Sequence, residues 1–358
     1  MDTAHAEIIN EYRRSTSRKL AYLGGFAILT VATGLAALSA GAADISLPEA
    51  LFAVLERYIP VQSGLSETRA EIAVTLRLPR VVMALVAGAS LAMAGVLLQA
   101  ILKNPLASPF TLGIGSAASF GASLAIILGV TVVGMTGAPS RWFVAVNAFV
   151  MSLVPAFVIF GLVRYRSASP ATMILAGIAM TYFFSASTSL LQYVGSEEAI
   201  AATVFWMFGS LEAVTWSQVL IVIAVAAPLT LIAYRLSWDL NALLQGGDVA
   251  RSLGVDTFRI RVLGMIVAAL VTGVTIAFLG TIGFIGLVAP HIARMLIGGD
   301  HRYLIPASLF LGGILLAGAD AVSRTVISPE VIPVGIMTAF LGVPFFFYLI
   351  VRRNREHW

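Results

Sequence analysis

The chain has 358 residues, of which 59% are hydrophobic and only 11% are charged, with a formal net charge of +4. A soluble domain carries roughly 25% charged residues, so this composition excludes a soluble globular enzyme, and its hydrophobicity excludes a disordered chain. The absence of cysteine excludes disulfides, thiolate metal sites and cysteine nucleophiles.

The N-terminal segment predicts a membrane helix rather than a cleaved signal peptide. Four basic residues between positions 13 and 19 precede an apolar run that extends from Leu20 to Ala43. This run is longer than the roughly 7–15 apolar residues of a signal peptide. We therefore expect it to form the first transmembrane span.

Apolar runs separated by charged or Pro/Gly-rich breaks predict ten transmembrane helices, since each span needs ~20 apolar residues. No break has the composition of a soluble domain boundary, so the sequence predicts an all-α polytopic membrane protein with a single transmembrane domain over residues 1–358. The predicted spans are Leu20–Ala42, Val81–Leu102, Thr111–Val132, Trp142–Val163, Ala171–Tyr193, Val219–Leu236, Ile260–Leu279, Gly283–Ile297, Leu304–Ala321 and Ile332–Val351.

The lysines and arginines between these spans fall mostly on one side. With a cytoplasmic N-terminus, sixteen of them are cytoplasmic and the six on the outside are Arg57, Arg69, Arg77, Arg80, Arg141 and Arg324. Cytoplasmic loops carry an excess of Lys and Arg. The bias therefore predicts a multi-pass protein of the cytoplasmic (inner) membrane, with cytoplasmic segments at residues 1–19, 237–259 and 352–358.

The longest cytoplasmic loop predicts two short helices joined by a glycine hinge. Apolar side chains at 240, 243 and 244 form one face and those at 249, 253 and 258 form another, with Gly246-Gly247 between them. Asp248 is expected to cap the second helix and Gly254 to end it. We interpret the pair as a docking element, with a plain surface loop as the alternative. Its candidate residues are Leu240, Leu243, Gly246, Gly247, Asp248, Arg251, Leu253 and Gly254.

Proline and small residues indicate irregular backbone at several helix ends. Such irregularity is tolerated in lipid only where protein or a water-filled cavity satisfies the freed backbone groups. Small residues let helices approach closely, and they can equally line a pathway. Kinks for tight packing and a transport pathway therefore both remain open, with His291 expected to be packed and hydrogen-bonded rather than a metal ligand. The pathway or gate candidates are Gly88, Gln99, Asn104, Pro105 and Pro290.

Three of the six outer arginines cluster at predicted helix mouths. They are Arg77 and Arg80 before the second span and Arg324 after the ninth, with Asp320 four residues before Arg324. An arginine fork grips a carboxylate with two hydrogen bonds. We expect these residues to dock an acidic partner, with contact to lipid phosphate as the alternative.

Catalytic chemistry is poorly supported by the sequence. The four histidines are scattered, no H-E-x-x-H motif occurs, and no G-x-x-x-x-G-K-[ST] nucleotide motif is present. We therefore predict no catalytic residue, no metal site and no cofactor on this chain, and no nucleic-acid partner. A proton-coupled pump is also disfavoured, because only Asp320 lies at a helix end and no other carboxylate sits deep in a span.

Four stretches together resemble the FecCD family, the permease subunits of ABC importers for iron chelates (siderophores), haem and cobalamin. The resemblance runs from about Leu20 to Arg353, and residues 332–344 fit it as well. The four stretches are Arg77-Leu78-Pro79-Arg80, the Asn104-Pro105-Leu106-Ala107 core of residues 99–109, residues 248–254, and Gly283-Phe284-Ile285-Gly286-Leu287-Val288-Ala289-Pro290-His291 within residues 283–294.

This resemblance implies a type II ABC importer permease fold and a homodimer with a translocation path along its twofold axis. It implies two ATP-binding subunits on the cytoplasmic face, which carry the ATP and Mg, and an extracytoplasmic substrate-binding protein. The loop at 239–256 would then be the coupling helices, and Arg77, Arg80 and Arg324 would meet glutamates of the binding protein. Membrane lipid is expected to surround the remaining surface of the transmembrane domain.

The expected function is therefore the permease subunit of an ATP-driven importer for an iron-siderophore-type chelate. Cobalamin or haem import by the same architecture is the alternative. The scarcity of metal-ligating side chains favours a cargo carried inside its chelator. A receptor without transport has no use for an ATPase dock, and a channel lacks a charged ring or filter-like loop.

Overall fold

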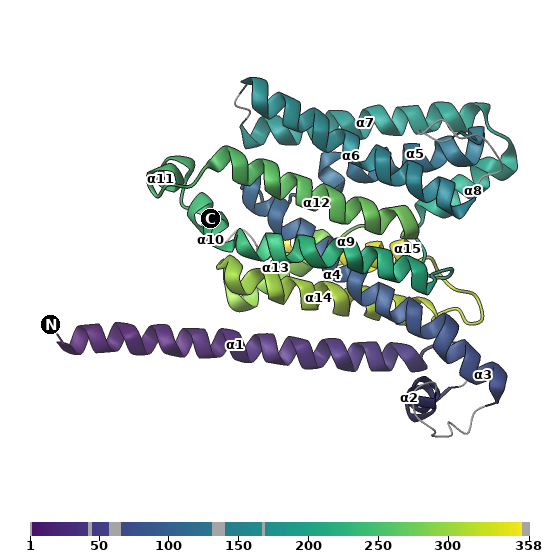
Figure 1. Ribbon diagram of the computed structural model, residues 1–358, viewed down its shortest axis with the longest axis horizontal. Helices are drawn as coiled ribbons and strands as arrows, with labels where there is room; N and C mark the ends of the chain where they lie inside the picture. The colour runs from purple at the N-terminus through teal and green to yellow at the C-terminus, as the bar shows by residue number, and fades with distance from the viewer. Residues whose placement is uncertain (1, 42–44, 57–65, 131–139, 167–168, 353–358) are drawn as a thin grey trace.

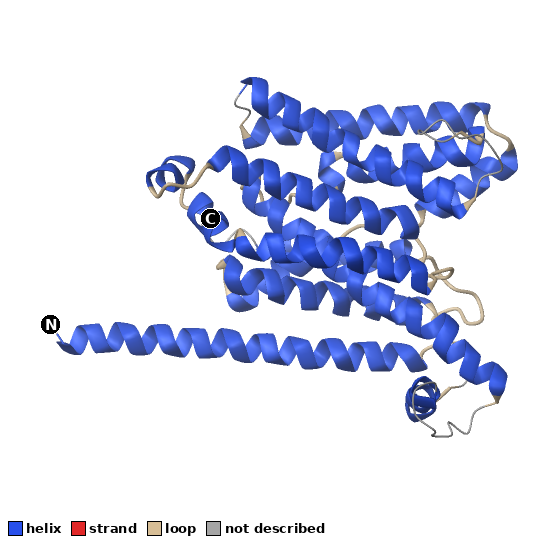
Figure 2. Ribbon diagram, in the orientation of Figure 1, coloured by secondary structure: helices blue, strands red, loops and turns tan. Residues whose placement is uncertain are grey.

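The computed structural model describes residues 2–41, 45–56, 66–130, 140–166 and 169–352, and these ranges contain helices and connecting loops without an extended β-strand (Figure 2). The helices are α1 (Asp2–Ser39), α2 (Leu47–Glu56), α3 (Glu67–Glu71), a π-helical segment (Ile72–Arg77), α4 (Leu78–Ile101), a 3-10 turn (Phe110–Leu112), α5 (Ile114–Leu128), α6 (Arg141–Arg166), α7 (Pro170–Val194), α8 (Glu197–Met207), α9 (Trp216–Arg235), α10 (Ser237–Leu244), α11 (Gly247–Ser252), α12 (Thr257–Leu279), α13 (Ile285–Ile297), α14 (His301–Ser323) and α15 (Val334–Arg352).

Each of the ten predicted spans corresponds to a helix. Seven helices are long and apolar enough to cross a membrane, and the other three spans are the shorter apolar helices α5, α13 and α15. The predicted ends at Ala42 and Val132, and the tail at 353–358, lie outside the described residues.

Two predicted spans differ at their starts. The first helix begins at Asp2 rather than Leu20, because the polar residues before Leu20 continue the helix beyond its apolar part. The third begins later than Thr111, because Gly113 takes a left-handed conformation (φ +81°) that separates the 3-10 turn from α5. Glycine adopts such backbone angles without a steric penalty.

Helix α4 is the centre of the molecule. It runs between α14 on one side and α12 on another, while α5, α6, α7 and α8 form a layer farther away and α1 lies along the opposite flank (Figure 1). Most of its residues are buried, including the large side chains of Met83, Leu91 and Leu97.

Glycine pairs set the two closest helix crossings on α4. A Cβ at Gly88 would lie 2.1 Å from the carbonyl oxygen of Gly312, and one at Gly312 would lie 2.2 Å from that of Gly88. A Cβ at Gly95 would lie 1.8 Å from the carbonyl oxygen of Gly286. Any side chain at these positions would force the helices apart, so the α4–α14 and α4–α13 contacts depend on glycine.

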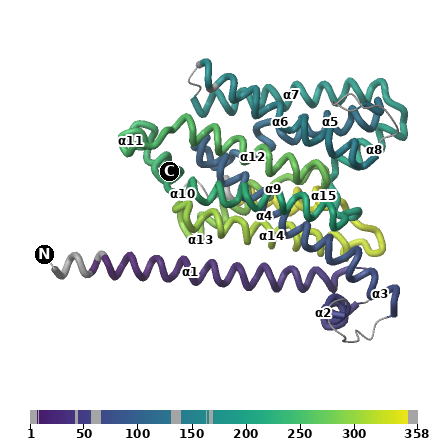
Figure 3. Tube along the Cα trace, in the orientation of Figure 1, coloured from purple at the N-terminus to yellow at the C-terminus, as the bar shows by residue number. Residues whose placement is uncertain are grey.

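The short helices mark the two ends of the bundle. Helices α10 and α11 lie at the same end as the start of α1, whereas α2 and α3 lie at the opposite end (Figure 3). The positive-inside bias predicts that the first of these ends faces the cytoplasm.

Candidate functional site

The loop between α9 and α12 forms the two short helices that the sequence predicts. In α10, Leu240 and Leu243 are fully buried and α10 packs against α14 and α4. This short helix is therefore fixed to the membrane bundle by its apolar face.

Helix α11 ends as predicted but begins differently. Gly254 (φ +83°) donates its N–H to the Arg251 carbonyl, and the N–H of Val255 reaches the Ala250 carbonyl, which is a Schellman ending. The expected cap by Asp248 is wrong: Gly246 (φ +129°) occupies the N-cap position without a side-chain bond. Asp248 lies in the first turn of α11 and pairs with Arg251 at 2.9 Å.

An exposed apolar surface covers this loop, and we name it the α10–α11 patch. Its members are between 38% and 66% exposed, although they lie at the end of the bundle and not along its sides. Exposed apolar patches of this kind mark contacts with a partner. The patch consists of Trp238, Leu244, Val249, Leu253 and Phe258.

Gln99 and Asn104 shape the end of α4 nearest the α10–α11 loop. The Gln99 side-chain oxygen accepts a hydrogen bond from Arg294 Nη2 of α13 at 3.2 Å. Lys103 adopts a left-handed conformation (φ +48°), and Asn104 Oδ1 then accepts the Leu106 N–H at 2.9 Å. These bonds hold the turn that carries Asn104 and Pro105 beside α13.

Gly88 and Pro290 lie at helix crossings. Gly88 is buried at the crossing with α14. Pro290 lies inside α13 rather than at a helix end, and the helix continues through it. Because proline lacks an N–H, the carbonyl four residues earlier, that of Gly286, is left free, and this is the carbonyl that faces Gly95. For these two candidates the structure favours tight packing.

The three outer arginines are buried inside the subunit, with 6% to 8% exposure, rather than displayed on its surface. Arg80 Nη2 lies 2.8 Å and Arg324 Nη2 lies 3.0 Å from the carboxylate of Asp320. Arg77 donates to the Leu38 carbonyl at 3.0 Å, and Arg324 donates to the carbonyls of Ala37 and Ala40 at 2.9 and 2.7 Å.

These bonds have a simple cause. The last carbonyls of a helix have no partner within the helix, and cations are favoured at its C-terminus. Arg77 and Arg324 therefore cap α1, and together with Arg80 and Asp320 they join it to α4 and α14. The expected exposure of the cluster was wrong because the sequence does not show that the end of α1 lies there.

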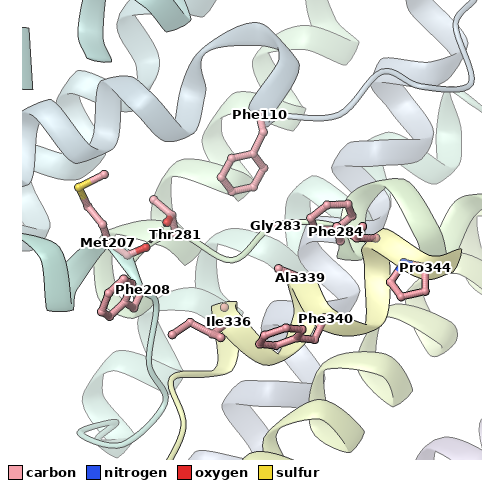
Figure 4. Close-up of a pocket in the computed structure, with 12 residues that line it drawn as sticks. Phe110, Met207, Phe208, Thr281, Gly283, Phe284, Ile336, Ala339, Phe340 and Pro344 are labelled. Atoms are coloured by element: carbon pink, nitrogen blue, oxygen red, sulfur yellow. Dashed lines mark hydrogen bonds between the residues drawn. The ribbon is translucent and has the colours of Figure 1, made fainter. Parts of the chain in front are cut away.

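A cavity of about 600 Å³ at α15 contains none of the sequence-predicted site residues (Figure 4). The hydroxyl of Thr281 donates to the Met207 carbonyl at its edge. Four phenylalanines give the cavity an aromatic character. Its lining is Phe110, Met207, Phe208, Thr281, Gly283, Phe284, Gly335, Ile336, Ala339, Phe340, Val343 and Pro344.

Phe284 is held in the cavity wall by a strained backbone. Its φ is +66°, a conformation that costs about 1–3 kcal/mol for a residue with a side chain. Its ring lies against α15 so closely that a Cβ at Gly342 would be 2.4 Å from the ring. Such strain is concentrated at functional sites. The Gly283-Phe284 stretch was part of the family resemblance, but its sequence gave no signal for the left-handed phenylalanine.

Within the described ranges, no three His, Asp or Glu side chains are grouped so that they could hold a metal ion. The walls of the cavity offer aromatic rings and a few backbone and hydroxyl groups instead. This arrangement suits contact with a large, partly apolar solute and supplies no ligand set for a bare ion.

Comparison with known proteins places these features in one family. The model of the FecCD transport family matches residues 29–352, so the chain belongs to the FecCD transport family of ABC transporter permeases. It is 39% identical to the cobalamin import permease BtuC of Halobacterium salinarum, over 83% of this chain and 77% of that protein. It is 36% identical to the hemin transport permease HmuU of Yersinia pestis, over 78% and 83%.

Two further similarities extend over more of the chain. The iron(3+)-hydroxamate import permease FhuB of Bacillus subtilis is 35% identical, over 98% of this chain and 88% of that protein. A solved structure assigned to the metal-chelate type of ABC transporter, in an inward-facing conformation, superposes with a TM-score of 0.80 at 31% identity, covering 92% of this chain and 98% of the other. The all-α permease fold predicted from the sequence is thus confirmed.

Proposed function

We propose that this chain is the permease subunit of an ATP-driven importer that carries an iron-siderophore-type chelate inward along the interface between two copies of itself. The observation that carries this proposal is the α10–α11 patch at the end of a membrane bundle. Relatives named for iron(3+)-hydroxamate, hemin and cobalamin import support the same class of cargo. Cobalamin or haem is the second candidate cargo, because the cavity is lined by aromatic rings that suit a flat macrocycle.

The patch fits the dock of an ATP-binding subunit. A helix that only terminates a loop would present polar side chains to water, whereas Val249 and Leu253 of α11 are exposed. The chain has no nucleotide-binding motif. In this proposal two ATP-binding subunits supply the ATP and Mg, and α10 and α11 receive their movement.

The same proposal implies an orientation in the membrane. The end that carries α10, α11 and the start of α1 would be cytoplasmic, and an even number of spans would return the C-terminus to it. The opposite end would face the substrate-binding protein. Docking of that protein at Arg77, Arg80 and Arg324 stays a prediction. It requires the guanidinium groups to reach carboxylates while they also hold α1 and Asp320.

The cargo is tested by uptake into cells that lack this chain and cells that carry it. The cells receive, one at a time, ferric hydroxamate, ferric citrate, haemin and cobalamin at equal concentration. Uptake of a ferric chelate that depends on this chain supports the leading proposal. Uptake of haemin or cobalamin alone would replace the iron chelate by the second candidate, and uptake of none would reject both.

The dock is tested by a charge placed in the patch. Leu253→Glu should abolish co-purification of the ATP-binding subunit, because a carboxylate would be buried at an apolar contact. Leu253→Met keeps an apolar side chain of similar volume and should retain it. Reversal of charge at Arg251 should also weaken the complex. Full retention of the ATP-binding subunit by Leu253→Glu and Arg251→Glu would show that this loop is not the dock.

A further inference from the structure

A polar cluster joins the loop helix α10 to the start of α14, although the two segments are about 60 residues apart in the sequence. Asn241 Nδ2 of α10 donates to Asp300 Oδ1 at 2.8 Å. Asn241 Oδ1 in turn accepts the backbone N–H of His301 at 2.9 Å. One amide side chain therefore bonds both the N-cap residue and the first residue of α14.

The histidine completes the amide's contacts. His301 Nδ1 lies 2.8 Å from Asn241 Oδ1, and since an amide oxygen cannot donate, Nδ1 carries the proton. His301 is fully buried. Both the backbone N–H and the imidazole N–H of His301 donate to Asn241 Oδ1. The side-chain amide of Asn241 is therefore held with its oxygen toward His301 and its nitrogen toward Asp300.

The carboxylate of Asp300 is held from the α14 side. It caps α14 by accepting the Arg302 N–H, and it binds the Arg302 guanidinium at 3.0 Å (Nε) and 2.6 Å (Nη2). Burial raises the pKa of Asp300, but the hydrogen bonds from Arg302 and Asn241 outweigh burial and lower it to about 2. The group is therefore ionised at neutral pH and accepts the Asn241 amide as a charge-assisted bond.

A second contact spans the same two helices. The Arg302 guanidinium lies 4.3 Å from the ring centroid of Trp238, in the first turn of α10. Beneath it, Leu240 and Leu243 anchor α10 on its apolar face. Apolar packing alone lets a short helix slide, whereas directed hydrogen bonds at Asn241 fix its register along α14.

Helix α14 can transmit a displacement of α10 to other helices of the bundle. It packs against α4 through the Gly88–Gly312 crossing, and Asp320 in its last turn is joined to Arg80 of α4. A displacement of α10 that is rigidly transferred to α14 would therefore reach α4 and the outer end of the bundle. A surface loop without a mechanical role needs no joint of this kind.

We propose that Asn241 and Asp300 form the joint through which α10 moves α14 when the ATP-binding subunit moves α10. Asn241 and Asp300 are positioning residues in this inference, which rests on the proposed dock at α10 and α11. The joint is distinct from the dock, because Asn241 bonds to α14 directly, whereas Val249 and Leu253 of the patch are exposed.

The test is a swap of the two side chains. Asn241→Asp places a second carboxylate against Asp300 and removes the donor. Asp300→Asn removes the acceptor charge. In the double variant Asn241→Asp/Asp300→Asn, the amide at 300 donates to the carboxylate at 241, which still accepts both His301 N–H groups. The pair is thereby rebuilt in reverse, and Glu330→Gln, an exposed carboxylate at the other end of the bundle, is the control.

The readout is ferric hydroxamate uptake per ATP hydrolysed by the purified complex in proteoliposomes. Loss of folded protein lowers uptake and hydrolysis together, so their ratio reports coupling and not stability. We expect each single variant to lower the ratio of uptake to hydrolysis about tenfold. The double variant should recover most of this ratio, because the effects of substitutions at contacting residues are not additive. The ATP-binding subunit should co-purify with all variants.

Three results separate the joint from the proposed function. Unchanged ratios in both single variants, with the wild type active, would overturn the joint and leave the dock standing. Loss in the double variant equal to the sum of the singles would also overturn it. If the wild type carries neither ferric hydroxamate nor ferric citrate, the cargo proposal fails, and the joint is then decided by spin labels at Gln245 and Gly299. Their distance distribution should be narrow in the wild type and broad in Asn241→Asp, and equal widths would overturn the joint.

Discussion

The two ends of α14 each carry one carboxylate with a cationic partner, but the two are built differently. Asp320, at the end that the proposed orientation places outside (the outer end), is only 1% exposed and binds two arginines from two helices, while a third arginine caps α1 beside it. Asp300, at the other end, is 18% exposed and binds an arginine of its own helix and an amide of α10.

The two carboxylates therefore contribute differently: the one at the outer end stabilises the fold, and the one at the other end fixes the position of α10 along α14. At the outer end, buried charges tie together three long helices, and removing one partner would leave the others uncompensated. At the inner end, one amide and one carboxylate position a short helix whose packing is otherwise apolar. We therefore expect changes at Asp320 to act on stability and changes at Asp300 to act on coupling.

The largest effect is expected from Asp320→Asn. The isosteric amide would leave Arg80 and Arg324 buried without the carboxylate that pairs with both of them, and breaking a buried ion pair costs about 3–5 kcal/mol. The thermal unfolding midpoint in detergent should fall far below that of the Glu330→Gln control. An unchanged midpoint would contradict the role assigned to the outer cluster.

The next effect is expected at the middle of α14. Gly312→Ala places a Cβ 2.2 Å from the Gly88 carbonyl, and overpacking of this kind costs about 1–3 kcal/mol. Gly318→Ala in the same helix meets no atom within 4 Å and should be neutral or slightly stabilising, since alanine favours the helix. Equal midpoints for the two variants would mean that the crossing is not set by glycine.

The outer arginines test whether capping of α1 and docking share the same residues. Arg324→Gln should lower stability by about 1–3 kcal/mol, because it leaves α1 carbonyls without partners. In nanodiscs, Arg77→Glu, Arg80→Glu and Arg324→Glu should weaken binding-protein affinity and flatten its salt dependence if these residues also dock. Lower stability with unchanged affinity and salt slope would leave capping as their sole role.

The smallest effect is expected from pH at the inner end. The pKa of Asp300 is lowered to about 2 from 3.8, so its contribution to stability is present above about pH 4 and is lost as pH falls toward 2. Between pH 5 and 8 Asp300 stays ionised beside Arg302 and His301, so its titration should not change coupling in this range. Asp300→Asn should remove part of the acid destabilisation between about pH 4 and 2, and an unchanged acid profile would contradict the ionised joint.

Local patterns predicted much of the fold. The ten helices follow from apolar runs, and the ending of α11 follows from Gly254, because glycine readily takes the left-handed conformation that a Schellman ending requires. The extension of α1 to Asp2 could not be read from hydropathy, since its residues are helical without being apolar.

Long-range contacts could not be predicted. Nothing in the sequence shows that the end of α1 meets Arg324, or that Asn241 meets Asp300, because each pair is brought together only by helix packing. The role of Pro290 is a further case. Proline normally argues for a break, but here the carbonyl it frees is accommodated against Gly95 of another helix. Phe284 was missed because a left-handed conformation is not expected of a bulky residue.

In the proposed joint, α10 and α14 move as one body while the ATP-binding subunit hydrolyses ATP. The chain has no cysteine, so spin labels attached at Gln245→Cys and Gly299→Cys in one of the two copies mark only these two positions of the chain. The test is to measure this distance by pulsed electron paramagnetic resonance in the full complex, first without nucleotide, then with trapped ATP, and then after hydrolysis. We expect one narrow distribution with the same mean in all three states. A mean that shifts with nucleotide in the wild type would show that α10 moves independently of α14, which would contradict the joint between the two helices.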